Sequence, residues 1–128
     1  MLRKIEAIIR SDSLEVVKEA LLDIGVLGLN VFEVRGHGRQ GGVPVSWRGI
    51  SHTMDLIPKV QINVVLADQD LERTVDAITQ AAKTGREGDG IIFISTIDDV
   101  VRVRTGERGA QAVTYIIDGP ERNQRPPR

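Results

Sequence analysis

Three glycine-rich turns in the sequence carry the charged residues best suited to binding a phosphate group. They are GHGRQGG at residues 36–42, GREGDG at 85–90 and RVRTGERG at 102–109. Glycine lets backbone N–H groups approach phosphate oxygens closely, and an arginine guanidinium can donate two parallel hydrogen bonds to such oxygens. Together the three turns predict a phosphate-binding site, whereas any one of them taken alone is more simply an ordinary turn.

Arg102 and Arg104 strengthen this prediction through their spacing. They belong to a stretch, residues 98–104, in which polar and apolar residues alternate as in a strand. Side chains two residues apart lie on the same side of a strand, so both guanidinium groups can converge on one polyanion. The alternative is that the two arginines line a solvated sheet edge.

The segment from Gly36 to Lys59 separates two strand-like stretches and has no clear period of its own. A connection of about 20 residues is longer than the usual link within a compact domain, which predicts a functional loop. Near its ends lie Gln40, whose amide oxygen could ligate magnesium, and Lys59, whose ammonium group suits a carboxylate. Taken alone, each of these two residues is more simply an ordinary surface residue.

The composition argues against several other kinds of site. There is no cysteine, which excludes disulfides and thiolate metal sites, and neither His37 nor His52 is spaced with carboxylates as zinc ligands are. The net charge of -1, from 17 basic and 18 acidic residues, argues against a general basic field that would bind nucleic acid or an anionic membrane. No apolar run approaches the ~20 residues of a membrane helix, so we expect a cytoplasmic protein without direct membrane insertion.

The elements that must position the turns alternate between strand and helix patterns. Strand patterns cover residues 4–10, 29–34, 58–67 and 91–97, and helical patterns with aspartate caps follow Asp12 and Asp68. The order βαββαβ predicts an α+β, ferredoxin-like domain over residues 1–112, with the long loop between its second and third strands. The sheet face without helices, with its valines and isoleucines, should be covered by oligomerisation. Residues 113–128 should form a peripheral C-terminal strand and a flexible tail.

These segments together resemble the PII signal-transduction proteins, the trimeric regulators of nitrogen metabolism. The matching motifs run in family order and spacing from about Arg3 to Ala112: KIEAIIR, VKEAL, GHGRQGG, WRG, DLIPKV, AAKTGREGDGIIFIS and RVRTGERG. The resemblance implies a homotrimer with ATP or ADP bound between subunits. It also implies that residues 37–55 or so are the family's T-loop, which changes shape with the ligand and contacts target proteins.

The resemblance further implies ligand contacts for individual residues. Gln40 would ligate Mg²⁺ beside the ATP phosphates, and 2-oxoglutarate would complete the metal shell while Lys59 pairs with its distal carboxylate. Gly28 and Val65 would lie nearer the base and ribose. The residues implied to bind the nucleotide are Gly28, Gly36, Arg39, Gln40, Val65, Gly88, Asp89, Gly90, Arg102 and Arg104.

Departures from the family pattern concern the T-loop and the phosphate site. The modifiable tyrosine of the family is His52 here, so no uridylylation is expected, although Ser51 remains a candidate for phosphorylation. Ile91 stands where members usually carry a lysine that reaches the phosphates, which leaves the preference for ATP over ADP or AMP open. The usual charged residues of the loop are replaced by Val43, Pro44 and Val45. An apolar tip suits a partner with a hydrophobic surface, such as a membrane transporter.

The first hypothesis is therefore a regulator and not an enzyme. It would bind ATP or ADP and 2-oxoglutarate with Mg²⁺ and control a partner in nitrogen metabolism through the T-loop. The alternative within the family is a divergent sensor of ADP, AMP or another small anion that regulates a transport or carbon-uptake system. An RNA-binding module shares the element order, but only two phenylalanines, Phe32 and Phe93, could stack on bases. A small phosphatase would need a dedicated base, which the sequence does not indicate.

Overall fold

The computed structural model describes residues 1–37, 43–47, 50–54 and 56–113, and of residues 43–54 it describes the backbone alone. Short 3₁₀ turns at Ser11–Ser13, Asp68–Asp70 and Gly109–Val113 accompany the main elements. Those elements are β1 (Leu2–Arg10), α1 (Leu14–Asp23), β2 (Asn30–Gly36), β3 (Val43–Trp47), β4 (Ile50–Met54), β5 (Ile57–Ala67), α2 (Leu71–Ala82) and β6 (Gly90–Ile97). None of the helices in these ranges is long and apolar enough to cross a membrane.

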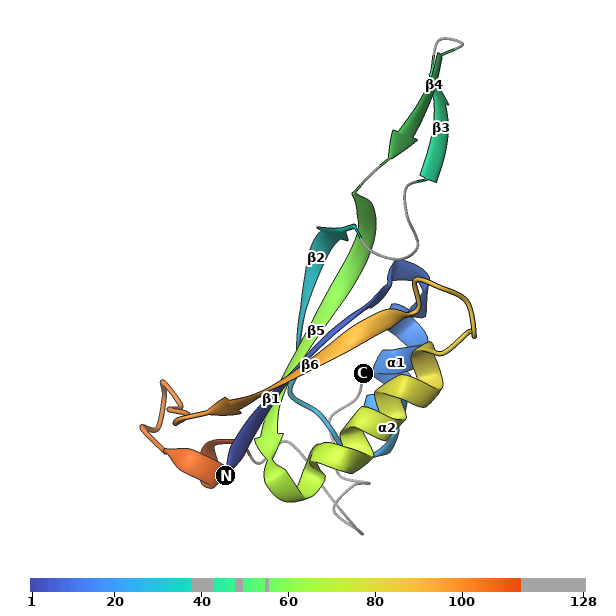
Figure 1. Ribbon diagram of the computed structural model, residues 1–128. Coiled ribbons are helices and arrows are strands. Elements are labelled where there is room, and N and C mark those ends of the chain that lie inside the picture. The colour runs from blue at the N-terminus through green and yellow to red at the C-terminus, as the bar shows by residue number, and fades with distance from the viewer. Residues whose placement is uncertain (38–42, 48–49, 55, 114–128) are drawn as a thin grey trace.

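The main sheet has four strands in the order β2-β5-β1-β6, and every neighbouring pair is antiparallel. Both helices cover one face of this sheet (Figure 1). The ferredoxin-like prediction is therefore confirmed. The strands β3 and β4 pair with each other in a separate ribbon, which stands beyond the end of the main sheet (Figure 1).

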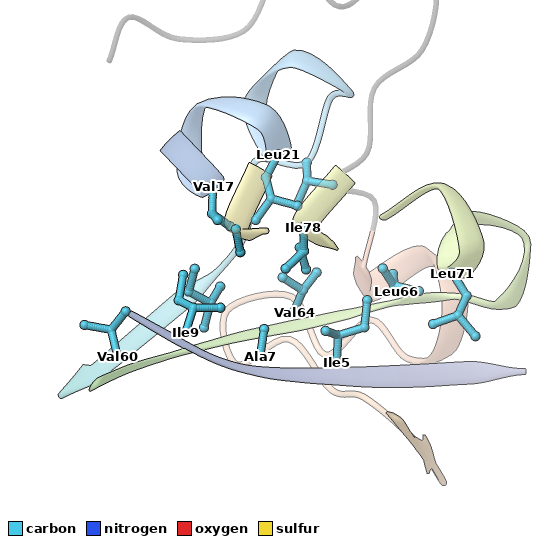
Figure 2. Packing of buried hydrophobic residues seen from close by; sticks show 13 residues of the cluster. Ile5, Ala7, Ile9, Val17, Leu21, Val60, Val64, Leu66, Leu71 and Ile78 are labelled. Carbon is cyan, nitrogen blue, oxygen red and sulfur yellow. The ribbon is translucent and has the colours of Figure 1, made fainter. Parts of the chain in front are cut away.

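Strict alternation along the two central strands builds the core. Ile5, Ala7 and Ile9 of β1 are buried toward the helices, as are the even-numbered apolar residues of β5 from Val60 to Leu66. They pack against α1 and α2, including Leu21 and Ile78 (Figure 2). Full burial of one such side chain contributes about 1.5–3 kcal/mol. The two central strands therefore form a rigid base for the loops at both ends of the sheet.

The opposite face of the sheet, which we call the open face, carries no helix. Its apolar residues include Phe32, Ile91 and Phe93, each about half exposed at 53, 54 and 49 %. Polar residues lie between them, because Phe93 stands opposite Glu6 and Phe32 opposite Gln61. The prediction of valines and isoleucines on this face is thus correct only in part.

Two connections differ from the sequence-based predictions. The segment predicted to lack a period contains the ribbon β3–β4, in register from Val43 opposite Met54 to Trp47 opposite Ile50. Residues 98–104 do not form a strand, since only Val101 makes an isolated bridge, to Arg108, and residues 103–105 form a turn. The reason is local: the Asp99 carboxylate accepts backbone hydrogen bonds from both ends of the connection and closes it into a loop.

Helix starts and the C-terminal strand were also predicted differently. Each helix begins after a 3₁₀ turn, with Ser13 and Asp70 at the N-cap and no side-chain capping bond at either, so the caps assigned to Asp12 and Asp68 were wrong. Val113 ends a 3₁₀ turn in place of starting a strand. The remainder of the predicted C-terminal strand and tail, residues 114–128, lies outside the described residues.

Candidate functional site

Asp89 organises the glycine loop that joins α2 to β6. Its carboxylate accepts hydrogen bonds from the backbone N–H groups of Thr84 (2.7 Å) and Gly85 (2.9 Å) and from the Thr84 hydroxyl. These bonds, the one from the Thr84 hydroxyl above all, hold the pKa of Asp89 well below its usual range. The Asp89 side chain, which was predicted to line a nucleotide site, therefore stabilises the conformation of its own loop.

Glycine is required where this loop enters β6. Gly90 has φ +133°, and a Cβ atom there would lie 2.2 Å from the carbonyl oxygen of Ile8 on the neighbouring strand. Gly88 has φ +92°, which likewise favours glycine. The backbone conformation alone therefore explains why Gly88 and Gly90, two of the glycines that suggested a phosphate-binding turn, are glycines.

Two cations from the central strands reach the carbonyls of the same loop. Arg10 donates from Nη2 to the carbonyl of Glu87 (2.5 Å) and from Nε to Asp89 (3.2 Å), while Lys59 donates from Nζ to the carbonyl of Gly88 (2.8 Å). Arg10 and Lys59 stand directly opposite each other in the β1–β5 register. Burial, and next the Arg10 guanidinium, lower the pKa of Lys59. A ligand carboxylate or phosphate would offset the free-energy penalty of keeping Lys59 charged, because an opposite charge nearby favours the ammonium form.

Lys59 also lines a pocket at the base of the segment that carries β3 and β4. Its volume, about 530 Å³, falls in the range of small-molecule sites. The end of β2, the start of β5 and the start of α1 contribute its walls. The lining residues are Ser11, Leu14, Glu33, Val34, Arg35, Pro58, Lys59 and Val60.

The other predicted nucleotide contacts divide between the two ends of the sheet. Gly36 lies with Gly88, Asp89 and Gly90 at the pocket end, since Gly36 pairs with Ile57 at the start of β5. Val65 lies six residues beyond Lys59 on β5, which corresponds to about 20 Å.

Three further predicted contacts share that far end of the sheet. Gly28 lies two residues before Asn30, the first residue of β2, which pairs with Asn63. Arg102 and Arg104 follow β6, whose Ser95 shares the partner Lys4 with Val65. Both arginines are exposed. One subunit therefore does not gather all these residues into a single site.

Several predicted residues fall in the part of the chain whose placement or side chains are not described. Arg39 and Gln40 lie within residues 38–42, outside the described residues. For Ser51 and His52 the backbone register is given, opposite Ser46 and Val45. Among the described residues there is no group of three or more histidines, aspartates or glutamates that could hold a metal ion.

Arg10 and Thr84 were missed by the reasoning from sequence. Each makes contacts that shape the glycine loop, yet neither was given a role: Arg10 belongs to the first strand pattern, and Thr84 only begins the second glycine-rich turn. Thr84 directly precedes GREGDG, a position from which a hydroxyl can bond back to the loop, and this was the available signal. Arg10 could be found only from the strand register that brings it beside Lys59.

An antiparallel ferredoxin-like sheet with a long protruding segment and a pocket at its base defines a class of small ligand-binding domain. The chain belongs to the family of the nitrogen regulatory protein P-II, whose family model matches residues 2–107. It is 51 % identical over 112 residues to the nitrogen regulatory protein P-II 1 of Methanothermobacter thermautotrophicus, covering 88 % of this chain and 97 % of that protein. Identity to the nitrogen regulatory protein P-II of Azospirillum brasilense is 49 %, covering 88 % and 100 % of the two chains.

A solved structure gives the same relationship at the level of the fold. The crystal structure of Arabidopsis thaliana PII bound to citrate superposes with a TM-score of 0.71 at 37 % identity, covering 87 % of this chain and 91 % of that one. The predicted family is thereby confirmed.

Proposed function

We propose that this protein is a homotrimeric regulator that binds adenine nucleotide between its subunits together with 2-oxoglutarate and Mg²⁺. It controls a partner protein of nitrogen metabolism through the segment that carries β3 and β4. Membership of the P-II family supports this function. The observation that carries it is that two cations, Arg10 and Lys59, both donate hydrogen bonds to one glycine loop, and that Lys59 also lines a pocket of about 530 Å³.

In this proposal Lys59 exchanges one acceptor for another. Its bond to the Gly88 carbonyl is given up for the distal carboxylate of 2-oxoglutarate, and the cation gains the counter-charge that burial makes favourable. Mg²⁺ takes few protein ligands when phosphates are present, so the Gln40 amide oxygen with the nucleotide and 2-oxoglutarate forms a reasonable donor set. When bound, the ion would supply positive charge that offsets the repulsion between the anionic ligands.

Calorimetric titration tests the proposal. The protein is titrated with ATP, ADP and AMP, each with and without MgCl₂, and then with 2-oxoglutarate. We expect nucleotide binding in every case and 2-oxoglutarate binding only with ATP and Mg²⁺. If no nucleotide binds at millimolar concentration, the proposed function is wrong.

A second candidate, a sensor of ADP, AMP or another small anion for a transport or carbon-uptake system, is favoured by Ile91. This residue is 54 % exposed on the open face and stands opposite Ile8. A lysine there would supply a charge-assisted contact of about 1.5–3 kcal/mol, roughly ten- to a hundredfold in affinity. In the variant Ile91→Lys, ATP should therefore gain at least tenfold over AMP. Tight 2-oxoglutarate binding to the unmodified protein would exclude this candidate.

The partner should dock on the ribbon β3–β4. The register places Val43, Val45 and Trp47 on the same face as Ile50, His52 and Met54, and it places Pro44, Ser46, Ser51 and Thr53 on the other face. A lone two-stranded ribbon is marginally stable in water, so an apolar surface on a partner would stabilise it. We propose a membrane protein such as a transporter as that partner.

Copurification with the membrane fraction of the native cells tests the partner. Replacing Val43 and Val45 by serine should remove the protein from that fraction, whereas the matched changes Ser46→Ala and Thr53→Ala on the other face should not. Equal recovery of all variants would refute the docking proposal. Because His52 replaces the modifiable tyrosine, the ribbon reports ligand occupancy without uridylylation.

A further inference from the structure

Beyond β6 the chain folds back on itself in a short arm, residues 98–109, and one carboxylate ties its two ends together. Asp99 accepts hydrogen bonds through Oδ1 from the backbone N–H groups of Val100 (2.8 Å) and Gly109 (3.2 Å). Through Oδ2 it pairs with the Arg108 guanidinium at 2.7 Å. Both the outgoing and the returning segment of the arm are therefore attached to this single side chain.

A tight turn fills the arm between these ends. The N–H group of Arg102 donates to the carbonyl of Glu107 (2.9 Å), and that of Gly106 donates to the carbonyl of Arg102 (2.8 Å). Gly106 and Gly109 have φ of +73° and +67°, which supports the reversal. The backbone that carries Arg102 and Arg104 is thus preformed.

Packing against the rest of the subunit does little to hold this shape. Val103 is fully exposed and Val101 is half exposed, and in Figure 1 the arm extends away from the sheet near the N-terminus. Anchorage comes from the following 3₁₀ turn, in which Ala112 and Val113 are buried. The Asp99–Arg108 pair is itself exposed and contributes little on its own. The restraint on the two ends therefore comes from the backbone bonds to Asp99 together with the bond from the Gly109 N–H group to the Val100 carbonyl (3.1 Å).

The arm cannot serve the glycine loop of its own subunit. Gly90 and Ile97 are the two ends of β6, which separates them by about 23 Å. Arg102 and Arg104 can therefore meet a nucleotide at a glycine loop only when that loop belongs to another copy of the chain.

We propose that Asp99 is a positioning residue of the nucleotide site, which fixes the arm so that Arg102 and Arg104 of one copy reach the phosphates held by the next. This inference rests on the proposed function, because it needs a nucleotide between subunits. A preformed arm loses less conformational entropy on binding than a loose one, and affinity rises accordingly. Asp99 acts through the backbone and need not touch the ligand.

The neighbouring Asp98 provides a matched control. It is exposed on the same arm, and its side chain makes no hydrogen bond or ion pair with another described residue. Asp98→Ala and Asp99→Ala remove the same charge at almost the same place. If only the negative charge mattered, both changes would tighten phosphate binding; if position matters, the two changes act in opposite directions.

The experiment measures ATP and AMP affinity by calorimetry for the full-length protein, Asp99→Ala, Asp99→Asn and Asp98→Ala. Sedimentation checks assembly, and NMR follows amide exchange at Arg102 and Gly106. Asp99→Ala should weaken ATP binding at least tenfold, weaken AMP much less, accelerate exchange at both amides and leave assembly unchanged. Asp99→Asn keeps an acceptor oxygen, so its ATP affinity should lie between those of the unmodified protein and Asp99→Ala. It is therefore the variant to interpret if Asp99→Ala fails to assemble.

Three outcomes would overturn the inference. Unchanged ATP affinity in the Asp99 variants overturns it while leaving the proposed function intact. An equal loss for ATP and AMP indicates a general structural role for Asp99. Absence of nucleotide binding by the unmodified protein refutes the proposed function and this inference together.

Discussion

At the residue scale, the glycine loop shows charge and conformation acting on the same few atoms. Arg10 and Lys59 donate hydrogen bonds to carbonyl oxygens of the loop, while the Asp89 carboxylate accepts hydrogen bonds from its N–H groups. The loop is therefore ordered before any ligand binds. Lys59, the cation whose pKa is lowered by burial, is also the one that lines the pocket. A ligand carboxylate can take over one hydrogen bond without unfolding the loop.

The close approach at Gly90 predicts a large stability effect from one methyl group. Gly90→Ala places a Cβ atom 2.2 Å from the Ile8 carbonyl oxygen at a φ of +133°, and the chain must shift to accommodate it. Backbone strain alone is of order 1–3 kcal/mol, so we expect a loss of at least about 2 kcal/mol in urea denaturation at fixed protein concentration. Gly36→Ala is the control, since a Cβ there meets nothing within 4 Å. Equal stability of the two variants would contradict the explanation.

The lowered pKa of Asp89 predicts how the free energy of unfolding changes at acid pH. Its pKa is depressed in the folded protein, so the stabilisation is present above the unfolded value of about 3.9 and is lost as the pH falls toward the folded value. The free energy of unfolding should fall between pH 5 and pH 2 more steeply for the unmodified protein than for Asp89→Asn. Urea denaturation across that range measures both curves, and parallel curves would rule out this role for Asp89.

At the scale of elements, the ribbon β3–β4 and the pocket share the same connections. β2 enters the segment at Gly36 and β5 leaves it at Ile57, and both strand ends contribute walls to the pocket. A ligand that engages Lys59 therefore acts where the ribbon joins the rigid sheet. The chain has a single tryptophan, Trp47 at the end of β3, which makes the ribbon observable without labelling.

Trp47 fluorescence should report ligand occupancy through Lys59. Adding 2-oxoglutarate to the protein with ATP and Mg²⁺ should change the emission of Trp47, because we expect the ligand to rearrange the connection that bears this residue. Lys59→Gln should remove the response to 2-oxoglutarate, since an amide cannot replace the cation. The fluorescence response to ATP without 2-oxoglutarate should stay unchanged in this variant. Glu72→Gln on α2, outside the pocket, is the control. A full 2-oxoglutarate response in Lys59→Gln would exclude Lys59 as the carboxylate partner.

At the scale of the whole molecule, the sequence predicted the sheet better than its extensions. The alternation of Ile5, Ala7 and Ile9 continues for a whole strand and is unambiguous, because the buried face needs it. The ribbon was missed since its strands have only five residues and one contains Pro44, which argues against a strand. The arm was missed because its shape depends on Asp99 and Gly109, ten residues apart, meeting in space. Lys59 was among the residues predicted from the sequence, and it lines the pocket. Arg10, the second cation at the glycine loop, could be found only from the strand register that places it opposite Lys59.

The open face predicts how the copies assemble. Phe93 exposes about half of its surface there, and burying that half against another copy would contribute about 2 kcal/mol per subunit. Phe93→Lys should therefore dissociate the proposed trimer. It should also abolish nucleotide binding, because the predicted nucleotide contacts lie at opposite ends of each subunit. Lysine is the informative choice, since Glu6, which pairs with Lys4 at 3.0 Å, stands opposite residue 93 and places a negative charge beside the new cation in the isolated subunit. Val16→Lys, half exposed on α1, adds the same charge elsewhere and should leave assembly intact. Sedimentation velocity separates the two variants, and a Phe93→Lys protein that remains trimeric would show that the open face is not the interface.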